Sequence, residues 1–176
     1  RPWRNTLPLG PPSFPREPSR RRMALSQDLL ATARRLARAN PKKPRQADLR
    51  RAVSTTYYAV FHALAQTCAD RFVGTSRDRS QEAWRQTYRA LDHGPTKQAC
   101  QRAASLGMPP EILRFAVAFR RLQEERHAAD YDPLARFSRS DVLVLIDDAA
   151  QAMHDLGQTP RPDQTAFAAL VLFKRR

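Results

Sequence analysis

Glycine is scarce in this chain, with five among 176 residues, and no segment shows the apolar–polar alternation of a half-buried strand. Apolar residues instead recur every three or four positions along most of the sequence. That spacing is typical of amphipathic helices that bury one face. The sequence therefore predicts an all-α fold in which four to five core helices form an up-down bundle.

Cysteine and long apolar runs are also scarce. The two cysteines, Cys68 and Cys100, lie in segments with helical patterns, and no Cys or His grouping has the spacing of zinc ligands. No apolar run approaches the roughly 20 residues of a membrane span, and no segment resembles the apolar part of a signal peptide. We expect buried reduced thiols, a cytoplasmic protein without membrane contact, and no metal or cofactor.

Acidic residues are few compared with basic ones. The chain holds 17 Asp and Glu against 31 Lys and Arg, which gives a formal net charge of +14. Such a balance favours polyanionic partners such as nucleic acid. Charge indicates attraction and not a reaction, so the functional interpretation depends on particular residues.

Residues 1–22 differ in composition from the rest of the chain. They contain six prolines and end in a run of arginines, with no helical period. A segment of this kind cannot bury enough apolar surface to fold alone. We predict a disordered Pro/Arg-rich arm or an upstream extension, since Met23 directly precedes the first helical pattern.

The remaining chain has the pattern of a series of helices. We predict a helical domain over 23–158 that carries an insertion over about 75–107, followed by a short C-terminal helix and a basic tail over 159–176. In the second helix, we expect an aromatic core in which His62 is hydrogen-bonded to a neighbour. The predicted helices cover about 26–39, 46–73, 81–91, 96–106, 111–129, 138–156 and 165–173, with a turn at 92–95.

The loop between the first two predicted helices is basic. It holds Lys42, Lys43 and Arg45, together with two prolines that cannot continue the preceding helix. These three side chains are candidates for contacts with RNA phosphates. A solvated basic loop is the alternative interpretation.

The segment 111–133 carries the strongest chemical signal. Its apolar residues form one helical stripe, and the same stripe continues to Arg126 and then Asp130. Charged side chains that face a core need partners, because an unpaired buried charge is costly. Four residues apart on a helix, Arg126 and Asp130 are predicted to form an ion pair.

Two segments resemble the HEPN family. Residues 54–63, Ser-Thr-Thr-Tyr-Tyr-Ala-Val-Phe-His-Ala, are similar to its long second helix, and residues 126–133, Arg-His-Ala-Ala-Asp-Tyr-Asp-Pro, to the end of its signature helix. The match covers about 26–156, with 81–106 as an insertion. The resemblance implies a HEPN-like bundle that dimerises by pairing signature helices across a two-fold axis.

The resemblance also implies a function. Many members of the family are metal-independent ribonucleases that act as toxins or defence effectors, often beside a nucleotidyltransferase. RNA or a nucleotide would be the ligand, and a nucleotidyltransferase or an antitoxin the partner. The family signature is an arginine followed, after four to six residues, by a histidine. An imidazole suits removal of a 2′-hydroxyl proton near neutral pH, and a guanidinium suits the charge that builds on the phosphate.

Two registers of this signature fit the sequence. In the first, His127 is the base and Arg120 or Arg121 holds the phosphate. Arg120 shares a helix face with His127, whereas Arg121 lies about 120° away and nearer to solvent. In the second register, Arg126 takes the signature position, Tyr131 stands after four intervening residues, and the catalytic histidine is absent; the pair of Arg126 with Asp130 is then structural. Tyr131 is a further candidate, as an assisting or modified residue.

The two registers lead to two functions. The first is a dimeric, metal-independent endoribonuclease of toxin or defence type, with His127 as base and Arg120 or Arg126 on the phosphate. The second is a non-catalytic HEPN protein that binds nucleotide or RNA and works through a partner protein. The sequence leaves both open.

Overall fold

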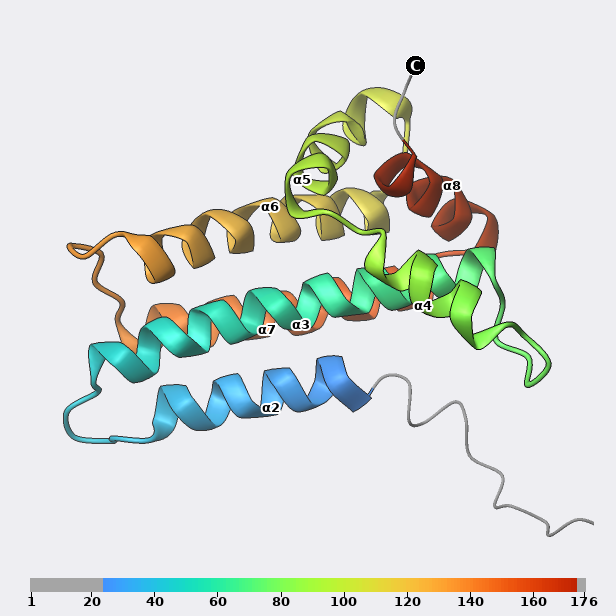
Figure 1. Ribbon diagram of the computed structural model, residues 1–176. Coiled ribbons are helices and arrows are strands. Elements are labelled where there is room, and N and C mark those ends of the chain that lie inside the picture. The colour runs from blue at the N-terminus through green and yellow to red at the C-terminus, as the bar shows by residue number, and fades with distance from the viewer. Residues whose placement is uncertain (1–23, 174–176) are drawn as a thin grey trace, which may run out of the picture.

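The computed structural model describes residues 24–173, so the predicted arm over 1–22 and the basic end over 174–176 lie outside the described residues. Within 24–173 the elements are helices, with no strand (Figure 1), and the prediction of an all-α bundle is confirmed. No helix in this range combines the length and hydropathy needed to cross a membrane. The helices are α2 (Ala24–Arg38), α3 (Gln46–Phe72), α4 (Gln81–Arg89), α5 (His93–Arg102), a 3₁₀ turn η1 (Ala104–Leu106), α6 (Pro110–Tyr131), α7 (Arg139–Gln158) and α8 (Arg161–Leu172).

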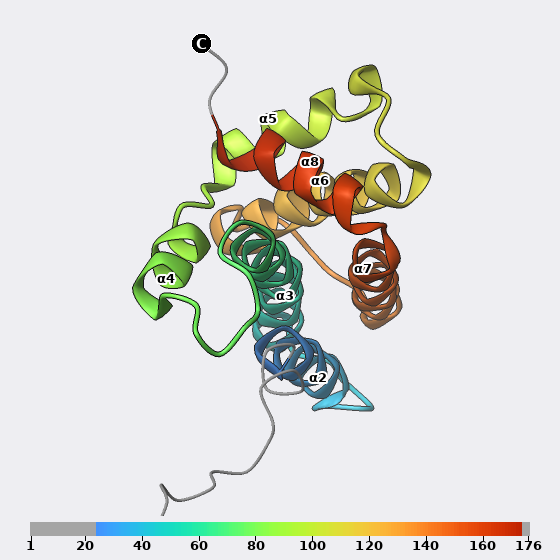
Figure 2. The same cartoon turned by 90° about the vertical axis from the view of Figure 1, so that its right-hand side faces the viewer.

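The long helix α3 lies at the centre of the bundle. It packs against α2, α6, α7 and α8, and Figure 2 shows it nearly end-on among them. Ala52, Ala59 and Ala63 are small enough to let neighbouring helices approach closely. The large side chains of Tyr57 and Leu64 are fully buried between them. Because α3 is covered on several sides, its apolar residues spread around the helix instead of forming one stripe.

Two helix starts differ from the predicted ranges, and proline is the reason in both. α8 begins at Arg161 and not at 165, with Pro162 in the first turn, where proline has no helical hydrogen bond to lose. α5 begins at His93, so the predicted turn at 92–95 is wrong. Asp92 occupies the N-cap position, and Pro95 lies in the first turn of the helix.

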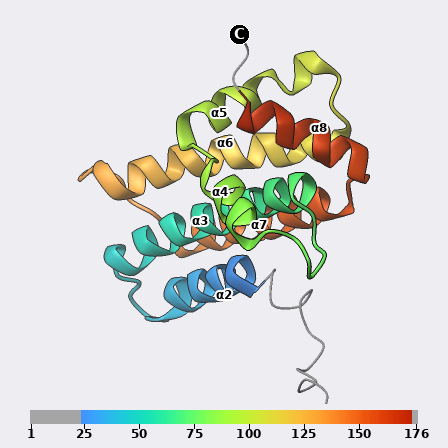
Figure 3. The ribbon, with the colours of Figure 1, turned by 45° about the vertical axis from the view of Figure 1, so that its right-hand side comes forward.

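The predicted insertion consists of two unlike halves. No side chain of α4 is buried, whereas α5 buries Thr96, Ala99 and Cys100 and packs on α6. Figure 3 shows α5 and α8 next to each other over α6, and they are in contact. In α8 the buried ring of Phe167 lies 5.9 Å, between centroids, from that of Phe115 in α6. Both α5 and α8 therefore belong to the same hydrophobic core as the long helices.

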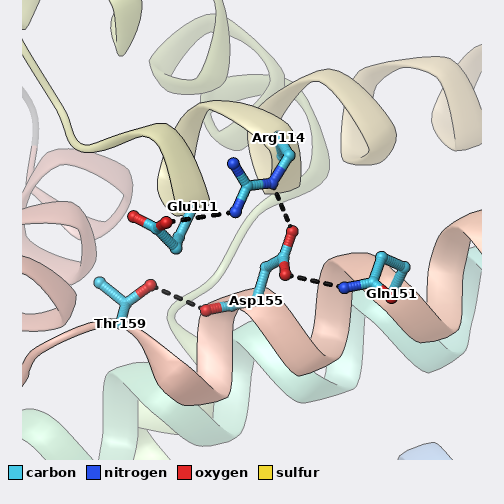
Figure 4. Close-up of polar contacts among 5 residues, drawn as sticks. All are labelled: Glu111, Arg114, Gln151, Asp155 and Thr159. Carbon is cyan, nitrogen blue, oxygen red and sulfur yellow. Dashed lines mark hydrogen bonds and ion pairs between the residues drawn. The ribbon is translucent and has the colours of Figure 1, made fainter.

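A polar clamp joins the first turns of α6 to the last turns of α7 (Figure 4). Arg114 Nε donates to Asp155 Oδ2 at 2.7 Å, and Gln151 Nε2 donates to Oδ1 at 2.9 Å. Arg114 Nη2 also reaches Glu111 Oε1 at 3.2 Å. The Asp155 side chain is only 9% exposed. The hydrogen bond from Arg114 holds the pKa of the Asp155 carboxyl below its usual range.

We expect the substitution Asp155→Asn to lower stability at pH 7, because the amide keeps the volume of the side chain but loses the charge that Arg114 pairs with. The loss should be about 1–2 kcal/mol, read as a lower melting temperature. The folded pKa of Asp155 lies below the unfolded value of about 3.9, so its contribution is complete above that pH and is lost as the pH falls further.

Thermal denaturation at pH 7 and at pH 3 tests this expectation, with Asp147→Asn on the same helix as the control. The Asp147 side chain is 73% exposed in its pair with Arg34, so its loss should have little effect. The gap between wild type and Asp155→Asn should narrow at pH 3. Equal melting temperatures for Asp155→Asn and wild type at pH 7 would contradict the role of the clamp.

Candidate functional site

The last turns of α6 are held against the first half of α3. Arg50 of α3 donates from Nε to the carbonyl oxygen of Ala129 at 2.7 Å and from Nη2 to that of Asp132 at 2.6 Å. These carbonyl groups have no partner within α6, because they lie at its C-terminal end. A cation at that end also suits the negative pole of the helix dipole. Arg50 thus holds the C-terminal end of α6, which carries Arg126, His127 and Tyr131, against α3.

Arg126 projects from the core-facing stripe of α6 towards α3. Its Nε lies 2.7 Å from Asp130 Oδ2, so the ion pair predicted from their spacing is present. The N–H at Nε does not have hydrogen-bond geometry, and the contact is therefore mainly coulombic. Arg126 Nη2 donates to the hydroxyl of Tyr58 at 3.1 Å, and the hydroxyl of Ser54 donates to Asp130 Oδ1. The side chains of Arg126 and Asp130 are 18% and 27% exposed.

Tyrosine rings surround the Arg126 guanidinium. Its central carbon lies between 5.5 and 5.9 Å from the centroids of three of them, within the range of cation–π attraction. We call this group the Arg126 cluster: Arg126, Asp130, Ser54, Tyr57, Tyr58 and Tyr131. The Arg126 guanidinium pairs with Asp130, donates to Tyr58 and lies near three tyrosine rings, which fits the structural role that the second register of the signature assigns to it.

Two histidine–tyrosine pairs lie next to the cluster. The hydroxyl of Tyr57 is 2.6 Å from His93 Nδ1, and the hydroxyl of Tyr88 is 2.7 Å from His62 Nδ1. The expectation that His62 is hydrogen-bonded to a neighbour is confirmed. His93 was missed as a site residue, because the Gly and Pro that follow it indicated a turn. In fact they open α5, which brings the His93 ring to within 4.2 Å of the ring of Phe61, between centroids.

Burial sets the protonation of these pairs. It lowers the pKa of both imidazoles, with a further contribution from His93 at His62 and from Arg126 at His93. It also raises the pKa of the Tyr57 and Tyr88 hydroxyls, so both keep their protons. A phenol hydroxyl beside a neutral imidazole is the natural donor, and we assign the Nδ1 atoms as acceptors. Neither histidine has a free Nδ1 for proton transfer.

His127 and Tyr131 lie on the solvent side of the same helix. His127 is exposed, Tyr131 is 64% exposed, and their ring centroids are 5.0 Å apart. One turn of helix separates the two residues, so they point to the same side of α6. Of the predicted catalytic residues, these two are the ones that a ligand in solution can reach and that also contact each other.

The two other arginines of the signature lie on different flanks of α6. Arg121 Nη1 forms an ion pair with Asp148 of α7 at 2.8 Å and is turned away from His127. Arg120 is half-buried on the flank of α6 that faces α5. Burial of Cys100 in α5 raises the pKa of its thiol to about 12, and the nearby charge of Arg120 opposes part of that rise. The Nε of Arg120 is buried without a hydrogen-bond partner in the part of the chain that the structure describes. Arg120 precedes His127 by seven residues, so their backbone positions are roughly 10.5 Å apart along the helix axis.

Further basic residues surround this end of the bundle. The loop with Lys42, Lys43 and Arg45 lies at the same end as the C-terminus of α6 (Figure 1). Both lysines are exposed, and Arg45 pairs with Asp48 at 3.1 Å. Arg51 was not among the predicted site residues. Its exposed side chain helps to line a pocket of about 400 Å³ between α3 and the end of α6, along with Ala47, Arg50, Ala129 and Asp130. The sequence did contain a signal for Arg51, because two consecutive arginines, Arg50 and Arg51, stand in the helix that directly follows the basic loop.

Two further features lie away from His127. An apolar groove of about 400 Å³ runs between α6 and α7 on the flank that carries Arg121, so it is not part of this site. Among residues 24–173, no three His, Cys, Asp or Glu side chains come together in an arrangement that would hold a metal ion. The exposed pair of His127 and Tyr131, together with the basic residues at this end, is therefore the candidate site.

We expect Arg126→Ala to destabilise the protein by about 1–3 kcal/mol, because it leaves the Asp130 carboxylate without its cation in a partly buried place. Thermal melting at pH 7 measures the effect. Arg121→Ala is the matched control, since the Arg121 side chain is 52% exposed in its surface pair and its loss should change stability by less than about 0.5 kcal/mol.

A second variant separates the ion pair from the packing of Arg126 on the tyrosine rings. Adding Asp130→Asn to Arg126→Ala removes the stranded charge, so part of the lost stability should return. A melting temperature for Arg126→Ala that equals that of the wild type would show that the pair is not structural.

Comparisons of the chain with protein-family models, with curated protein sequences and with solved structures gave no significant match. The similarity to the HEPN family therefore depends on the residues at 54–63 and 126–133. In the structure these two segments contact each other, because Arg126 donates to Tyr58 and Ser54 donates to Asp130.

Proposed function

We propose that this protein is a metal-independent endoribonuclease of HEPN type that acts as a dimer, with His127 as the general base. The observation that carries the proposal is the exposed pair of His127 and Tyr131 on the end of α6. A solvent-facing imidazole is free to take the proton from a 2′-hydroxyl, whereas the imidazoles of His62 and His93 are occupied by tyrosines.

The surroundings of each arginine suggest how the roles are divided. Arg126 holds Asp130 and Tyr58, so it supports the end of α6 and does not contact RNA. Arg120 has no acidic partner within residues 24–173, and it shares a flank of α6 with His127. Arg120 is therefore the arginine that we assign to the phosphate. Lys42, Lys43 and Arg51 would attract the rest of the RNA strand.

A dimer would bring these parts together. Within one chain, the backbone positions of Arg120 and His127 are roughly 10.5 Å apart along α6, which is two helical turns. Pairing of two α6 helices about a two-fold axis would set Arg120 of one copy beside His127 of the other. The toxin or defence role, with an antitoxin or a nucleotidyltransferase as partner, follows from the family resemblance and belongs to the same proposal.

A second function is favoured by one specific observation. Two of the candidate arginines already form ion pairs with carboxylates. Arg126, directly before His127 in the sequence, pairs with Asp130, and Arg121 on the flank towards α7 pairs with Asp148. A HEPN protein with its cations held in this way would bind RNA or nucleotide without cleaving it, and would work through a partner protein. The two functions differ in whether His127 is needed for RNA cleavage.

Incubation of the purified protein with single-stranded RNA of mixed sequence in EDTA tests the first function. We expect cleavage by the wild type and a rate at least about 100-fold lower for His127→Ala, because general base catalysis contributes that much or more. His154→Ala is the matched control, since His154 is an exposed histidine on α7 and should keep full activity. Melting temperatures should stay nearly unchanged in both variants.

Each result has a direct meaning. Cleavage that persists unaltered in His127→Ala would contradict the assignment of the base. No cleavage by any of the three proteins, with RNA still bound in a gel-shift assay, would favour the non-catalytic function. We also expect a dimer in light scattering at micromolar concentration, and a monomer would contradict a site shared between two copies.

A further inference from the structure

α4 is attached to the bundle in a different way from every other α-helix of residues 24–173. None of its side chains is buried, whereas each of the others contributes buried residues to the core. It is held on α3 by two hydrogen bonds: Trp84 Nε1 donates to Asp70 Oδ1 at 2.8 Å, and Tyr88 pairs with His62 Nδ1 at 2.7 Å. Segments with few buried apolar contacts are the first to open in a folded protein.

The ring of His62 is part of a stack with two rings of α4. Trp84 and Tyr88 are stacked with centroids 5.1 Å apart, and Tyr88 and His62 with centroids 5.9 Å apart and planes inclined by 15°. We call residues 75–90 the α4 flap. It begins after Gly74, whose φ of +91° turns the chain away from α3, and it ends before the buried side chain of Leu91. Figure 2 shows α4 on the outer side of α3, apart from the other helices.

The bond between Tyr88 and His62 depends on the charge of the imidazole. A neutral ring with its proton on Nε2 accepts from the tyrosine hydroxyl at Nδ1. A protonated ring carries hydrogens on both nitrogens, so two donors would then face each other across 2.7 Å. The hydroxyl would have to turn away, and the partly buried cation would favour contact with water.

The neighbouring groups do not offset that charge. The side chains that face His62 are Tyr58 of α3, Tyr88 of α4 and His93 of α5. His93 in turn faces Arg126 of α6, with Asp92 next to it in sequence. The nearest carboxylate of α3 on the flap side, Asp70, is two turns further along and is bonded to Trp84. A proton on His62 would therefore have no carboxylate beside it within residues 24–173, and any charge on the neighbouring His93 would oppose it.

We propose that the α4 flap is a pH-sensitive cover that is docked on α3 while His62 is neutral and is released when His62 is protonated. Release would uncover the half-buried ring of His62, which stacks on Tyr88 while the flap is docked and lies 6.3 Å, between centroids, from Tyr58 of the Arg126 cluster. The proposal depends on the contacts of α4 alone and does not require that the protein cleaves RNA.

The direction of the pH dependence follows from the docked state. Burial lowers the pKa of His62 when the flap is docked, and release returns it towards the ordinary value of about 6.5. Docking is therefore strongest well above pH 6.5 and weakens as the pH falls below that value. Its equilibrium constant should fall by up to about tenfold per pH unit until the docked pKa is reached.

Trp84 reports on the flap, and Trp3→Phe removes the other tryptophan of the chain. In this background, fluorescence and acrylamide quenching are measured between pH 8 and pH 5, together with far-UV circular dichroism. We expect quenching to increase below pH 6.5 while the helical signal of the bundle is retained. No change in quenching would overturn the proposal, and so would a simultaneous loss of the helical signal, since the whole bundle would then be unfolding.

Two substitutions assign the effect to His62. His62→Gln keeps a side chain that can accept from Tyr88 and does not titrate, so the change below pH 6.5 should disappear. His154→Gln, on the exposed side of α7, should leave it in place. Tyr88→Phe removes the hydroxyl that bonds to His62. This variant should show high quenching of Trp84 already at pH 8, and the quenching should change little as the pH is lowered to 5. An unaltered pH transition in His62→Gln or in Tyr88→Phe would overturn the proposal.

Discussion

A guanidinium on the core-facing side of α6 constrains the rest of this structure. The side chain of Arg126 lies where the apolar stripe of the helix would otherwise continue, so it needs partners at that place. Asp130 supplies charge, Tyr58 supplies a hydrogen-bond acceptor, and tyrosine rings cover what remains. The first half of α3 and the last turns of α6 are held together by these contacts and by Arg50, so the two helices lie side by side there.

The same constraint divides the residues of α6 by their position around the helix. Residues on the core side of α6 determine how this helix packs on its neighbours, and Arg126 is the last of them with a long side chain. Residues on the α7 side, Arg114 and Arg121, form ion pairs that tie the two helices together. The remaining flank carries Arg120 and His127, and it is the flank with a histidine that solvent can reach. One helix thus combines the support of the site with the groups proposed to act in it.

The helices between α3 and α6 add a second layer to this arrangement. α5 is part of the core and places His93 against Tyr57, which in turn packs on Arg126. α4 has no fully buried side chain and is held by hydrogen bonds, ring stacking and the partly buried ring of Tyr88. The buried apolar side chains of α5 do not titrate near neutral pH, whereas the bond between Tyr88 of α4 and the His62 imidazole depends on protonation.

The sequence by itself determined the helical class, most helix positions and the pair of Arg126 and Asp130. These features are local, because helical period and a spacing of four residues are set by the chain alone. Only the tertiary structure decided that Arg121 belongs to Asp148, that Arg120 faces α5, and that His62 and His93 meet tyrosines from other helices. Tyr88 is 26 residues away from His62 in the chain, and Tyr57 is 36 residues away from His93. Contacts over such distances depend on how helices pack, and no periodicity within one helix encodes them.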